Sequence, residues 1–425
     1  VMTSETLRSH ETTQYPYPTK PRLNLRSRGR TRLLGVTAGH CPGPDAVQLG
    51  IAPAHHHGPR QTATSQPRQP DGSPLRDPDV LLAHLEPRLS VGGERYVLLD
   101  EVQLLDDFVG VLNELARMPG VDVYVTGSNS KFLSTDIATE FRGRGDEVHV
   151  LPLTFGEFMQ ARYDGEARAW ADYVEFGGLP LVATMATPEQ KSAYLKNLFE
   201  ETYIADIVER NGLRKTQELE DLIDVLASAT GSLTKTAKIQ ATFKSALKSD
   251  ISLNTVKAYI GCLEDSFLVS AASRYDIKGR KYIGAPLKYY FEDVGLRNAR
   301  IGFRQSEENH LMENVIYNEL RYRGFSVDVG VVKRREYDEK GVQHPVTREV
   351  DFVATLAGRR YYIQSAFTIP DAEKAEQEKA SLLGIDDSFK KIVIVKDVVN
   401  TSSDEHGIVT MGLFDFLLNP DSLER

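Results

Sequence analysis

Beyond the first 75 residues, the hydrophobic pattern alternates between helical and strand periods. Apolar residues recur at helical spacing in Val80–Leu85 and Phe108–Met118. Tyr96–Leu99 is a short apolar run and Val121–Thr126 alternates, and both patterns predict strands. Strands that alternate with helices build a parallel sheet. We therefore predict an α/β domain here, to which Glu147–Leu151 adds a third strand.

The middle of the chain has a helical pattern followed by two short strands. Residues 155–230 are mostly helical by periodicity. Three helices followed by two strands that can pair as a wing predict a winged helix, in which Ser252 caps the third helix. The helices are expected at Leu219–Ser228, Thr234–Leu247 and Ser252–Phe267, and the strands at Leu268–Ser273 and Lys288–Phe291.

This middle segment also carries a local excess of positive charge. Between Ala229 and Ile260 there are five lysines and one acid, in a chain whose net charge is −9. Lys244, Lys248 and Lys257 are therefore candidates for contacts with nucleic-acid phosphates. A module that packs against a protein, with a solvated lysine face, fits the same pattern.

The C-terminal pattern is that of the PD-(D/E)XK nuclease fold. A helix with Glu313 is followed by a strand with Asp351 and, after a turn, by a strand with Gln364. In such nucleases an acid, and then an acid and a lysine two residues apart on the next strand, hold Mg²⁺ and activate water. Gln364 replaces the second acid and Ala366 replaces the lysine, so we expect a degenerate nuclease-like site. Glu313 is either a vestigial ligand or an ordinary helix-surface glutamate.

The first 75 residues differ from the rest of the chain. They contain nine Lys or Arg and four acids, and ten of the chain's twenty prolines. Neither helical nor strand periodicity is visible, which predicts a segment without regular structure. The tract His55–His57 is interpreted as part of this tail and not as a metal site, since it lacks ordered partners at ligand spacing.

Length and composition favour an α/β protein of several domains. A chain of 425 residues can bury two or three cores, and its two cysteines form no disulfide framework. No apolar run reaches the roughly 18 residues of a membrane span, so we expect a cytoplasmic protein without membrane contact. The expected parts are a disordered or aberrant segment (1–75), a parallel-sheet core (76–160), a helical lid (161–215), a winged helix (216–290) and a nuclease-like domain (291–425).

Two adjacent acids give the clearest chemical signal. The apolar run that begins at Tyr96 ends in Asp100 and Glu101, so a buried strand delivers both carboxylates to the carboxyl edge of the sheet. In nucleotide hydrolases this is the Walker B element. Its first acid is on the Mg²⁺ side, and its second orients or deprotonates the attacking water.

Polar residues after the next strand extend this candidate site. Ser128 and Asn129 follow Gly127 at the end of a strand, where a hydrolase places groups that sense the terminal phosphate. A helix cap is the competing interpretation. Arg144 precedes the third strand, and it is either a solvated turn residue or an arginine finger directed at a neighbouring subunit.

Several motifs in order resemble the prokaryotic AAA-type ATPases that carry a C-terminal domain of unknown function related to restriction endonucleases. The resemblance covers about residues 75–425. It implies bound ATP and Mg²⁺, with Asp100 as the Mg²⁺-side acid, Glu101 as the catalytic base, Asn129 as the sensor and Arg144 as the finger. The matching motifs are Asp100-Glu-Val-Gln, Thr126-Gly-Ser-Asn-Ser-Lys, Gly143-Arg, Leu151-Pro-Leu-Thr-Phe-Gly-Glu-Phe and Gly177-Gly-Leu-Pro.

The phosphate loop of this family is not recognisable. It would contain the pair Gly-Lys, which occurs nowhere in the chain. The corresponding region, Asn24–Leu34, has Gly29 as its one glycine and Arg30 in place of lysine. A guanidinium is a broad fork, whereas lysine is a slim point charge. We hypothesise that residues 1–75 are an out-of-frame or mis-joined translation of the segment that should encode the first strand and loop.

By this resemblance, the sequence predicts an AAA-type protein that binds and hydrolyses ATP. Nucleotide binding is expected to be impaired in this chain. The alternative is a module that binds nucleic acid or protein without catalysis, and a nuclease is a third class. The winged helix would meet a DNA or protein partner, and a homo-oligomer is compatible with the arginine finger.

Overall fold

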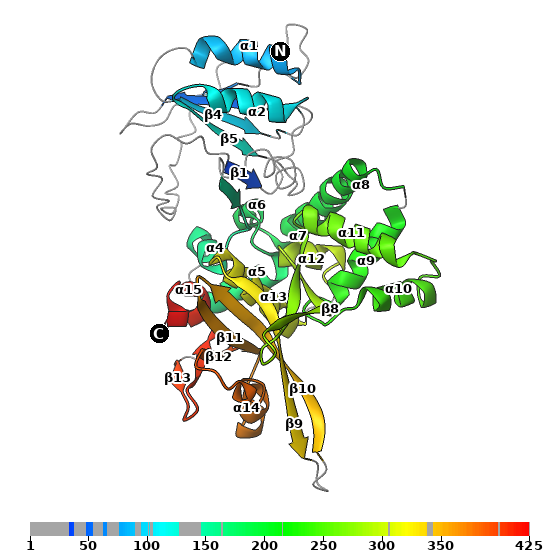
Figure 1. Cartoon of the computed structure of the whole chain (residues 1–425), viewed down its shortest axis with the longest axis vertical. Helices are drawn as coiled ribbons and strands as arrows, with labels where there is room; N and C mark the ends of the chain where they lie inside the picture. Colours follow the sequence, from blue (N-terminus) through cyan, green and yellow to red (C-terminus); the bar gives the residue numbers. More distant parts are fainter. Residues whose placement is uncertain are drawn as a thin grey trace. The chain divides into compact units, whose positions relative to one another are not determined.

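The protein is a mixed α/β structure, as the sequence pattern predicted. In a computed structural model, the described residues contain a six-stranded and an eight-stranded sheet with flanking helices (Figure 1). The structure describes residues 34–37, 48–53, 63–65, 76–89, 95–100, 102, 105–126, 146–162, 165–214, 216–304, 307–337, 343–397 and 400–424.

Four neighbouring strands of the six-stranded sheet are parallel. β4 (Arg95–Asp100) pairs with β5 (Val121–Thr126), and β5 pairs with β1 (Leu34–Thr37). β1 also pairs with β6 (Asp146–His149), so it lies between β5 and β6. The predicted parallel arrangement is confirmed for these strands.

The other side of β4 carries antiparallel strands in a segment for which the sequence predicted no regular structure. β2 (Gln48–Pro53) pairs with β4, and β3 (Ala63–Ser65) pairs with β2. Together with β1, they place three strands within the first 75 residues. The expectation that this segment lacks regular structure is therefore wrong for these ranges, because strand pairing compensates for their weak periodicity.

The core of this sheet follows from the periodicity of its elements. α2 (Phe108–Arg117) buries Val111 and Leu115, and alternate residues of β5, Val123 and Val125, belong to the same cluster. α1 (Pro78–Leu89) adds two buried leucines. Asp107 caps α2 by accepting a hydrogen bond from the Gly110 N–H at 3.3 Å.

A helical region follows, as the sequence predicted. From Phe176 onward, most of its buried apolar side chains form one cluster that also includes residues of the next two strands, whereas those of α4 and most of α5 pack into the larger cluster of the eight-stranded sheet. A π-helix at Leu198–Ile204 joins α7 to α8. The helices are α4 (Phe155–Arg162), α5 (Glu166–Phe176), α6 (Pro180–Thr184), α7 (Pro188–Asn197), α8 (Ala205–Asn211), α9 (Thr216–Ser228), α10 (Thr236–Ser245) and α11 (Leu253–Asp265).

The eight-stranded sheet has the order β13-β14-β12-β11-β10-β9-β7-β8. Its central strands β9, β10 and β11 are antiparallel, while β12 is parallel to both β11 and β14. The strands are β7 (Val269–Asp276), β8 (Lys281–Phe291), β9 (Ser326–Tyr337), β10 (Gln343–Leu356), β11 (Arg359–Ala366), β12 (Lys390–Val395), β13 (Ser402–Ser403) and β14 (Ile408–Gly412).

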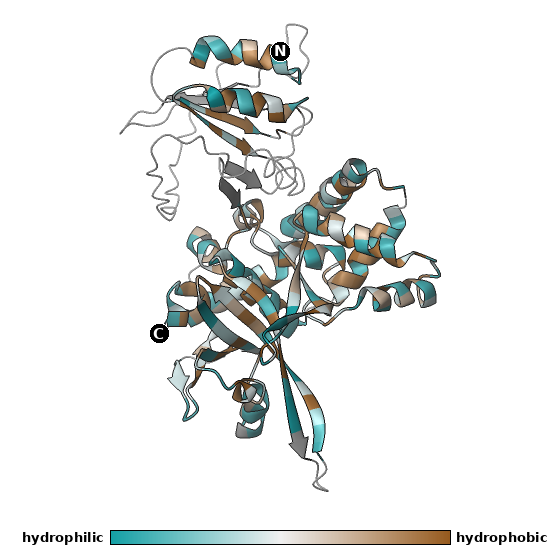
Figure 2. Cartoon of the chain, in the orientation of Figure 1, coloured by the Kyte–Doolittle hydropathy of each residue, from teal (hydrophilic) through white to brown (hydrophobic). Residues whose placement is uncertain are grey.

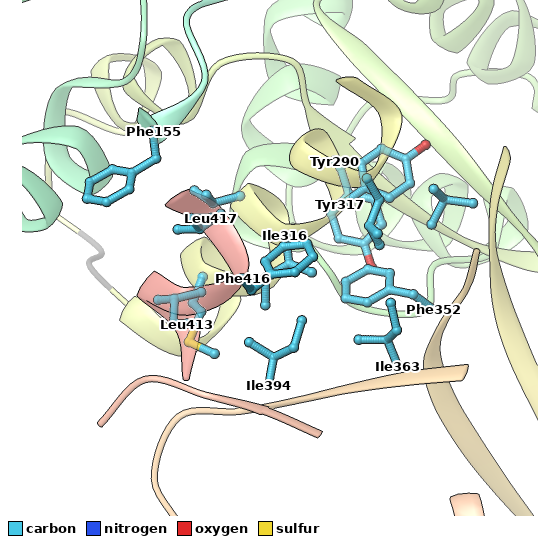
Figure 3. Packing of buried hydrophobic residues seen from close by; sticks show 14 of the residues in the cluster. Phe155, Tyr290, Ile316, Tyr317, Phe352, Ile363, Ile394, Leu413, Phe416 and Leu417 are labelled. Atoms are coloured by element: carbon cyan, nitrogen blue, oxygen red, sulfur yellow. The ribbon is translucent and has the colours of Figure 1, made fainter. Parts of the chain in front are cut away.

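Each face of this sheet has its own core. On β12, Ile392 and Ile394 belong to one cluster, while Val393 and Val395 belong to another, as strand alternation requires. The first and larger cluster packs against helices (Figure 3). The helices of this part are α12 (Val294–Arg300), α13 (Glu308–Tyr322), α14 (Ala372–Lys379) and α15 (Leu413–Leu418), with short 3₁₀ turns at Leu382–Gly384 and Ser422–Glu424.

The two strands expected to form a wing also belong to the eight-stranded sheet. β7 and β8 form an antiparallel hairpin, as predicted, and β7 pairs in parallel with β9 at Arg274↔Val329 and Asp276↔Val331. The expected boundary near residue 290 therefore falls inside a continuous sheet. The sequence pattern gave no sign of this pairing, because it joins segments that are far apart in the chain.

We expect Gly295→Ala in α12 to destabilise the protein strongly. A Cβ on Gly295 would lie 2.0 Å from the carbonyl oxygen of Phe176, which is backbone and cannot move aside cheaply. Overpacking of this kind costs at least about 2 kcal/mol. Denaturant unfolding monitored by circular dichroism measures the loss.

Gly261→Ala in α11 is the matched control, since no atom lies within 4 Å of the added Cβ. It should be neutral or stabilise by up to about 1 kcal/mol, because alanine is the better helix former. Equal unfolding midpoints for the two variants would contradict the close packing of α12 against the end of α5.

Candidate functional site

The carboxyl ends of β4 and β5 bring the first candidate site together. Asp100 is the last residue of β4, and Thr126 is the last residue of β5. The Thr126 hydroxyl donates a hydrogen bond to Oδ1 of Asp100. The acid strand and the strand that precedes Gly127 thus end side by side, as the parallel arrangement requires.

The remaining predicted residues of this site lie outside the described residues. These residues are Glu101, Ser128, Asn129 and Arg144. Their roles therefore stay predictions. What the structure establishes is that Asp100 and Thr126 end two adjacent parallel strands.

The position of β1 changes the interpretation of the phosphate-loop region. β1 starts at Leu34, where the segment Asn24–Leu34 ends, and it lies inside the sheet beside β5. A phosphate loop follows its strand along the chain. Gly29 and Arg30 precede β1, so their assignment to a loop that follows this strand is wrong. A loop after β1 would start at Ala38, outside the described residues.

The second candidate site is a buried cluster around Lys288. Its ammonium lies 2.7 Å from Glu313 Oε1, 2.8 Å from Glu349 Oε1 and 3.3 Å from Asp351 Oδ1. Tyr290 donates a hydrogen bond to the same oxygen of Glu313 at 2.6 Å. Lys288, Glu313 and Asp351 are buried, whereas the Glu349 side chain is 30% exposed. One cation thus stands among three carboxylates.

Strand alternation on β8 explains how Lys288 reaches this cluster. Tyr289 and Phe291 pack into the cluster of the helical region, whereas Tyr290 packs into the core under α13. Lys288 lies two residues before Tyr290, so its side chain is on the same face of β8. It therefore faces α13, which carries Glu313. The requirement to bury alternate aromatic residues thus directs a lysine into the interior.

A β-bulge on β10 places Asp351. Val350 pairs with Gly330 and Val353 pairs with Asp328, so two residues of β10 face one residue of β9. The bulge lets Asp351 and Phe352 both turn toward α13. Asp351 Oδ2 also accepts a hydrogen bond from the N–H of Ser365 at 2.9 Å, which ties the cluster to β11.

The charges of the cluster are strongly coupled. Burial raises the pKa of Glu313 to about 7, and repulsion from Asp351 adds to this, although the Lys288 ammonium opposes it. Burial alone would lower the pKa of Lys288, but the attraction of the three carboxylates outweighs it and raises that pKa. Lys288 therefore stays charged, and Glu313 is the member that takes up a proton near neutral pH.

The structure brings together two of the three residues of the predicted nuclease-like site. Glu313 and Asp351 come together, but Gln364 accepts a hydrogen bond from Ser381 at 3.4 Å, and its strand neighbours Tyr362 and Ala366 belong to the core on the other face. Lys288 supplies the cation that Ala366 lacks. Sequence reasoning missed it, although a lysine beside three aromatic residues in a strand was an available signal.

Within the described ranges, the structure has no group of three or more His, Cys, Asp or Glu side chains arranged to hold a metal ion. The three carboxylates of the cluster lie at ion-pair distances from the Lys288 ammonium, and these distances are longer than those between carboxylate oxygens and a bound metal ion. As described, the Lys288 cluster is a closed ion-pair network.

The Gly177-Gly-Leu-Pro motif has a structural explanation. Asp293 caps α12, and its carboxylate accepts hydrogen bonds from the N–H groups of Leu296 at 2.9 Å and Gly178 at 2.8 Å. Gly177 has φ 77°, and a Cβ there would lie 2.2 Å from the Asp293 carboxylate. Burial raises the pKa of Asp293 to about 6, although these backbone donors oppose the shift.

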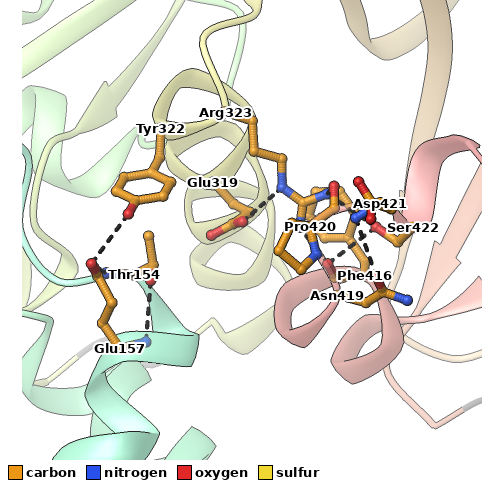
Figure 4. A network of polar contacts seen from close by, with 10 residues as sticks. All are labelled: Thr154, Glu157, Glu319, Tyr322, Arg323, Phe416, Asn419, Pro420, Asp421 and Ser422. Atoms are coloured by element: carbon orange, nitrogen blue, oxygen red, sulfur yellow. Dashed lines mark hydrogen bonds and ion pairs between the residues drawn. The ribbon is translucent and has the colours of Figure 1, made fainter. Parts of the chain in front are cut away.

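The motif that begins at Leu151 is also structural. Thr154 and Glu157 form a reciprocal cap of α4, in which each side chain bonds the other residue's backbone N–H or side chain at 3.0–3.2 Å. Tyr322 of α13 donates to the same glutamate at 3.1 Å, and its neighbour Arg323 bonds Glu319 at 2.7 Å (Figure 4). The motif thus fixes α4 against α13.

The three lysines proposed for phosphate contact are all exposed. Lys244 lies in the last turn of α10, Lys248 follows that helix, and Lys257 lies on α11. Ser252 caps α11 through the N–H of Thr255 at 3.0 Å, as predicted. None of the helices that the structure describes has the length and apolar character needed to cross a membrane.

Comparison with known proteins supports the resemblance. A family model described as an AAA domain matches residues 59–159, and one described as a domain of unknown function (DUF8612) matches residues 167–307. An uncharacterized protein of Haemophilus influenzae is 34% identical over 329 residues, which cover 76% of this chain and 77% of that protein. The uncharacterized protein MJ1544 of Methanocaldococcus jannaschii is 27% identical over 319 residues, with 71% and 68% covered.

The chain therefore belongs to the same family as the Haemophilus influenzae protein, and it carries an AAA domain followed by a domain of unknown function. Among solved structures, protein VC1899 of Vibrio cholerae matches over 76% of this chain and 80% of its own, with 10% identity. Its TM-score of 0.21 is too low to support a conclusion about fold. The relation of the C-terminal part to nucleases stays a prediction.

We expect Lys288→Met to destabilise the protein by about 3–5 kcal/mol, because it leaves buried carboxylates without their cation. Lys374→Met is the control, since Lys374 pairs with Glu378 at 2.7 Å on the surface of α14 and is 40% exposed. Its loss should cost at most about 0.5 kcal/mol. Chemical denaturation of both variants measures the difference, and similar losses would contradict the closed network.

Protonation of Glu313 should make stability depend on pH. Its pKa is raised from 4.5 to about 7 in the folded protein, so the folded state binds more protons in that interval. The free energy of unfolding should therefore fall as pH rises from 4.5 through 7. Glu313→Gln should remove this component and keep the part due to Asp293, whose pKa is raised from 3.8 to about 6. Denaturant titrations across this interval measure the free energy of unfolding of both proteins. The same dependence on pH in both would contradict the raised pKa of Glu313.

Proposed function

We propose that this chain is an AAA-type ATP·Mg²⁺ protein whose nucleotide affinity is weak. The contact between Thr126 and Asp100 supports this most directly, because it brings the acid strand and the sensor strand together at one sheet edge. Asp100 would act on the Mg²⁺ side and Glu101 as the base. Ser128 and Asn129 would contact the terminal phosphate.

The residues at this edge suit a hard cation. Asp100 offers carboxylate oxygen, the donor that Mg²⁺ prefers, and Mg²⁺ would neutralise the charge of the phosphates. Arg144 would reach the nucleotide of a neighbouring subunit in a homo-oligomer. The phosphate loop is the part of the site that would limit nucleotide affinity, since no segment of the sequence reads Gly-Lys. Backbone N–H groups on a glycine-rich loop supply much of phosphate affinity.

For the C-terminal sheet we propose nuclease ancestry without cleavage. The order α13, β9, β10, β11, α14, β12, with β12 parallel to β11, is consistent with a PD-(D/E)XK-like core. Cleavage is disfavoured because Lys288 fills the space among the carboxylates and the cluster is buried. In this proposal α5–α8 serve as the helical lid of the ATPase.

A second function is supported by the exposed lysines of α10 and α11. Lys244, Lys248 and Lys257 would let the three helices α9–α11 act as a winged helix that contacts DNA. The competing partner is an acidic protein surface.

We expect the chain to bind Mg²⁺·ATP weakly and to gain affinity when residues 1–75 are replaced by the strand and phosphate loop of an AAA relative. The gain should be at least about tenfold, since the loop supplies donors that the acid edge lacks. Isothermal titration calorimetry with ATP and Mg²⁺ measures it.

In that chimera, Asp100→Asn should remove the Mg²⁺ dependence of binding, whereas Glu101→Gln should keep binding and slow hydrolysis by about 100-fold or more. An unchanged rate in Glu101→Gln would identify the activity as a contaminant. Tight binding by the chain itself, or no gain in the chimera, would contradict the proposal.

A further inference from the structure

A cluster of cations lies on two neighbouring segments that the proposed function does not use. One is the turn between β7 and β8, and the other is the outer part of β9. All of these side chains are exposed, and Tyr282, next to the turn, is 65% exposed. The cations are Lys278, Arg280, Lys281, Lys333, Arg334 and Arg335, and we call this set the basic arm.

The two segments of the basic arm are held side by side. β7 pairs with β9 up to Asp276↔Val331, and the N–H of Ile277 donates to the carbonyl oxygen of Val331 at 3.1 Å. Lys333 reaches back to Asp276 at 3.0 Å. The cations of the turn therefore begin beside those of β9, where Lys333 and Arg335 lie on one face of the strand and Arg334 lies on the other.

The strand part of the basic arm is a two-stranded ribbon. Past Val331, the described pairing of β9 is with β10 alone, from Arg348↔Val332 to Gln343↔Tyr337. Figure 1 shows the two strands projecting from the sheet, and Figure 2 shows the projecting part of β9 as hydrophilic. Val332 is buried in the core at its base. The ribbon is thus anchored at one end and displays cations at its root.

The charge of this surface contrasts with that of the whole chain, which is −9. Asp276 is buried and engaged with Lys333 and with the N–H of Gly279. Lys278 has only a 3.7 Å ion pair with Asp386, and both side chains are more than 70% exposed. The sequence continues with acids at 336, 338 and 339, so the run of cations ends at Arg335.

We propose that the basic arm binds the phosphate backbone of duplex DNA. Clustered exposed lysines and arginines match the charge of a polyphosphate chain and gain from counterion release. A two-stranded ribbon fits the wide major groove of B-form DNA, whereas the major groove of duplex RNA is too narrow for it. This inference does not depend on nucleotide binding, and it concerns a surface separate from the lysines of α10 and α11.

The test is fluorescence anisotropy of a labelled DNA duplex titrated with the full chain at several salt concentrations. Arg334→Glu/Arg335→Glu and Arg280→Glu/Lys281→Glu should each weaken binding by about tenfold or more and flatten the salt dependence by about one phosphate contact per residue. Arg334→Lys/Arg335→Lys should keep most of the affinity. Circular dichroism checks that each variant is folded.

Arg168→Glu/Arg214→Glu is the matched control, with the same change of charge at two exposed arginines outside the basic arm. It should leave DNA binding unchanged. Lys244→Glu/Lys257→Glu tests the competing surface on α10 and α11, and loss of binding in that variant alone would overturn the proposal in favour of the winged helix. Equal affinity for polyglutamate would overturn it in favour of an acidic protein partner, and stronger binding of duplex RNA would contradict the groove argument.

Discussion

Much of the C-terminal structure depends on one constraint, which is that the charged groups of the segment Lys288–Asn298 must find partners inside the protein. Lys288, Asp293 and Arg297 are each at most 3% exposed. Lys288 binds carboxylates of α13 and β10, Asp293 holds the turn before α6, and Arg297 donates to the carbonyl oxygen of Ala227 at 2.8 Å. A buried charge without a partner costs far more than a missing apolar contact. These pairs therefore fix how β8 and α12 sit against α9, α13 and the sheet.

The sequence was a good guide to the elements and a poor guide to long-range pairing. Periodicity located β4, α2 and β5 to within a residue or two, because each has one buried face. It could not reveal that β7 pairs with β9, because both strands had plausible partners nearby. It also missed β1, whose place between β5 and β6 depends on neighbours that come much later in the chain.

For the candidate sites too, local features were predictable from the sequence and long-range contacts were not. Asp100 was predictable because a strand end and a carboxylate are both local features. The partner of Glu313 was not, since Lys288 lies 25 residues away on a strand that looked like part of a wing. A single β-bulge determines the direction of the Asp351 side chain, and a bulge cannot be recognised from the hydrophobic periodicity of the sequence. Gln364 was assigned by its motif position, but the alternation of β11 turns it toward Ser381.

The continuity of β7 with β9 has an evolutionary consequence. The matched domain of unknown function ends at residue 307, before α13 begins. The ion pair between Lys288 and Glu313 crosses that limit, and so does the sheet. Recombination at this point would give a protein with a buried lysine and no carboxylate to pair with it.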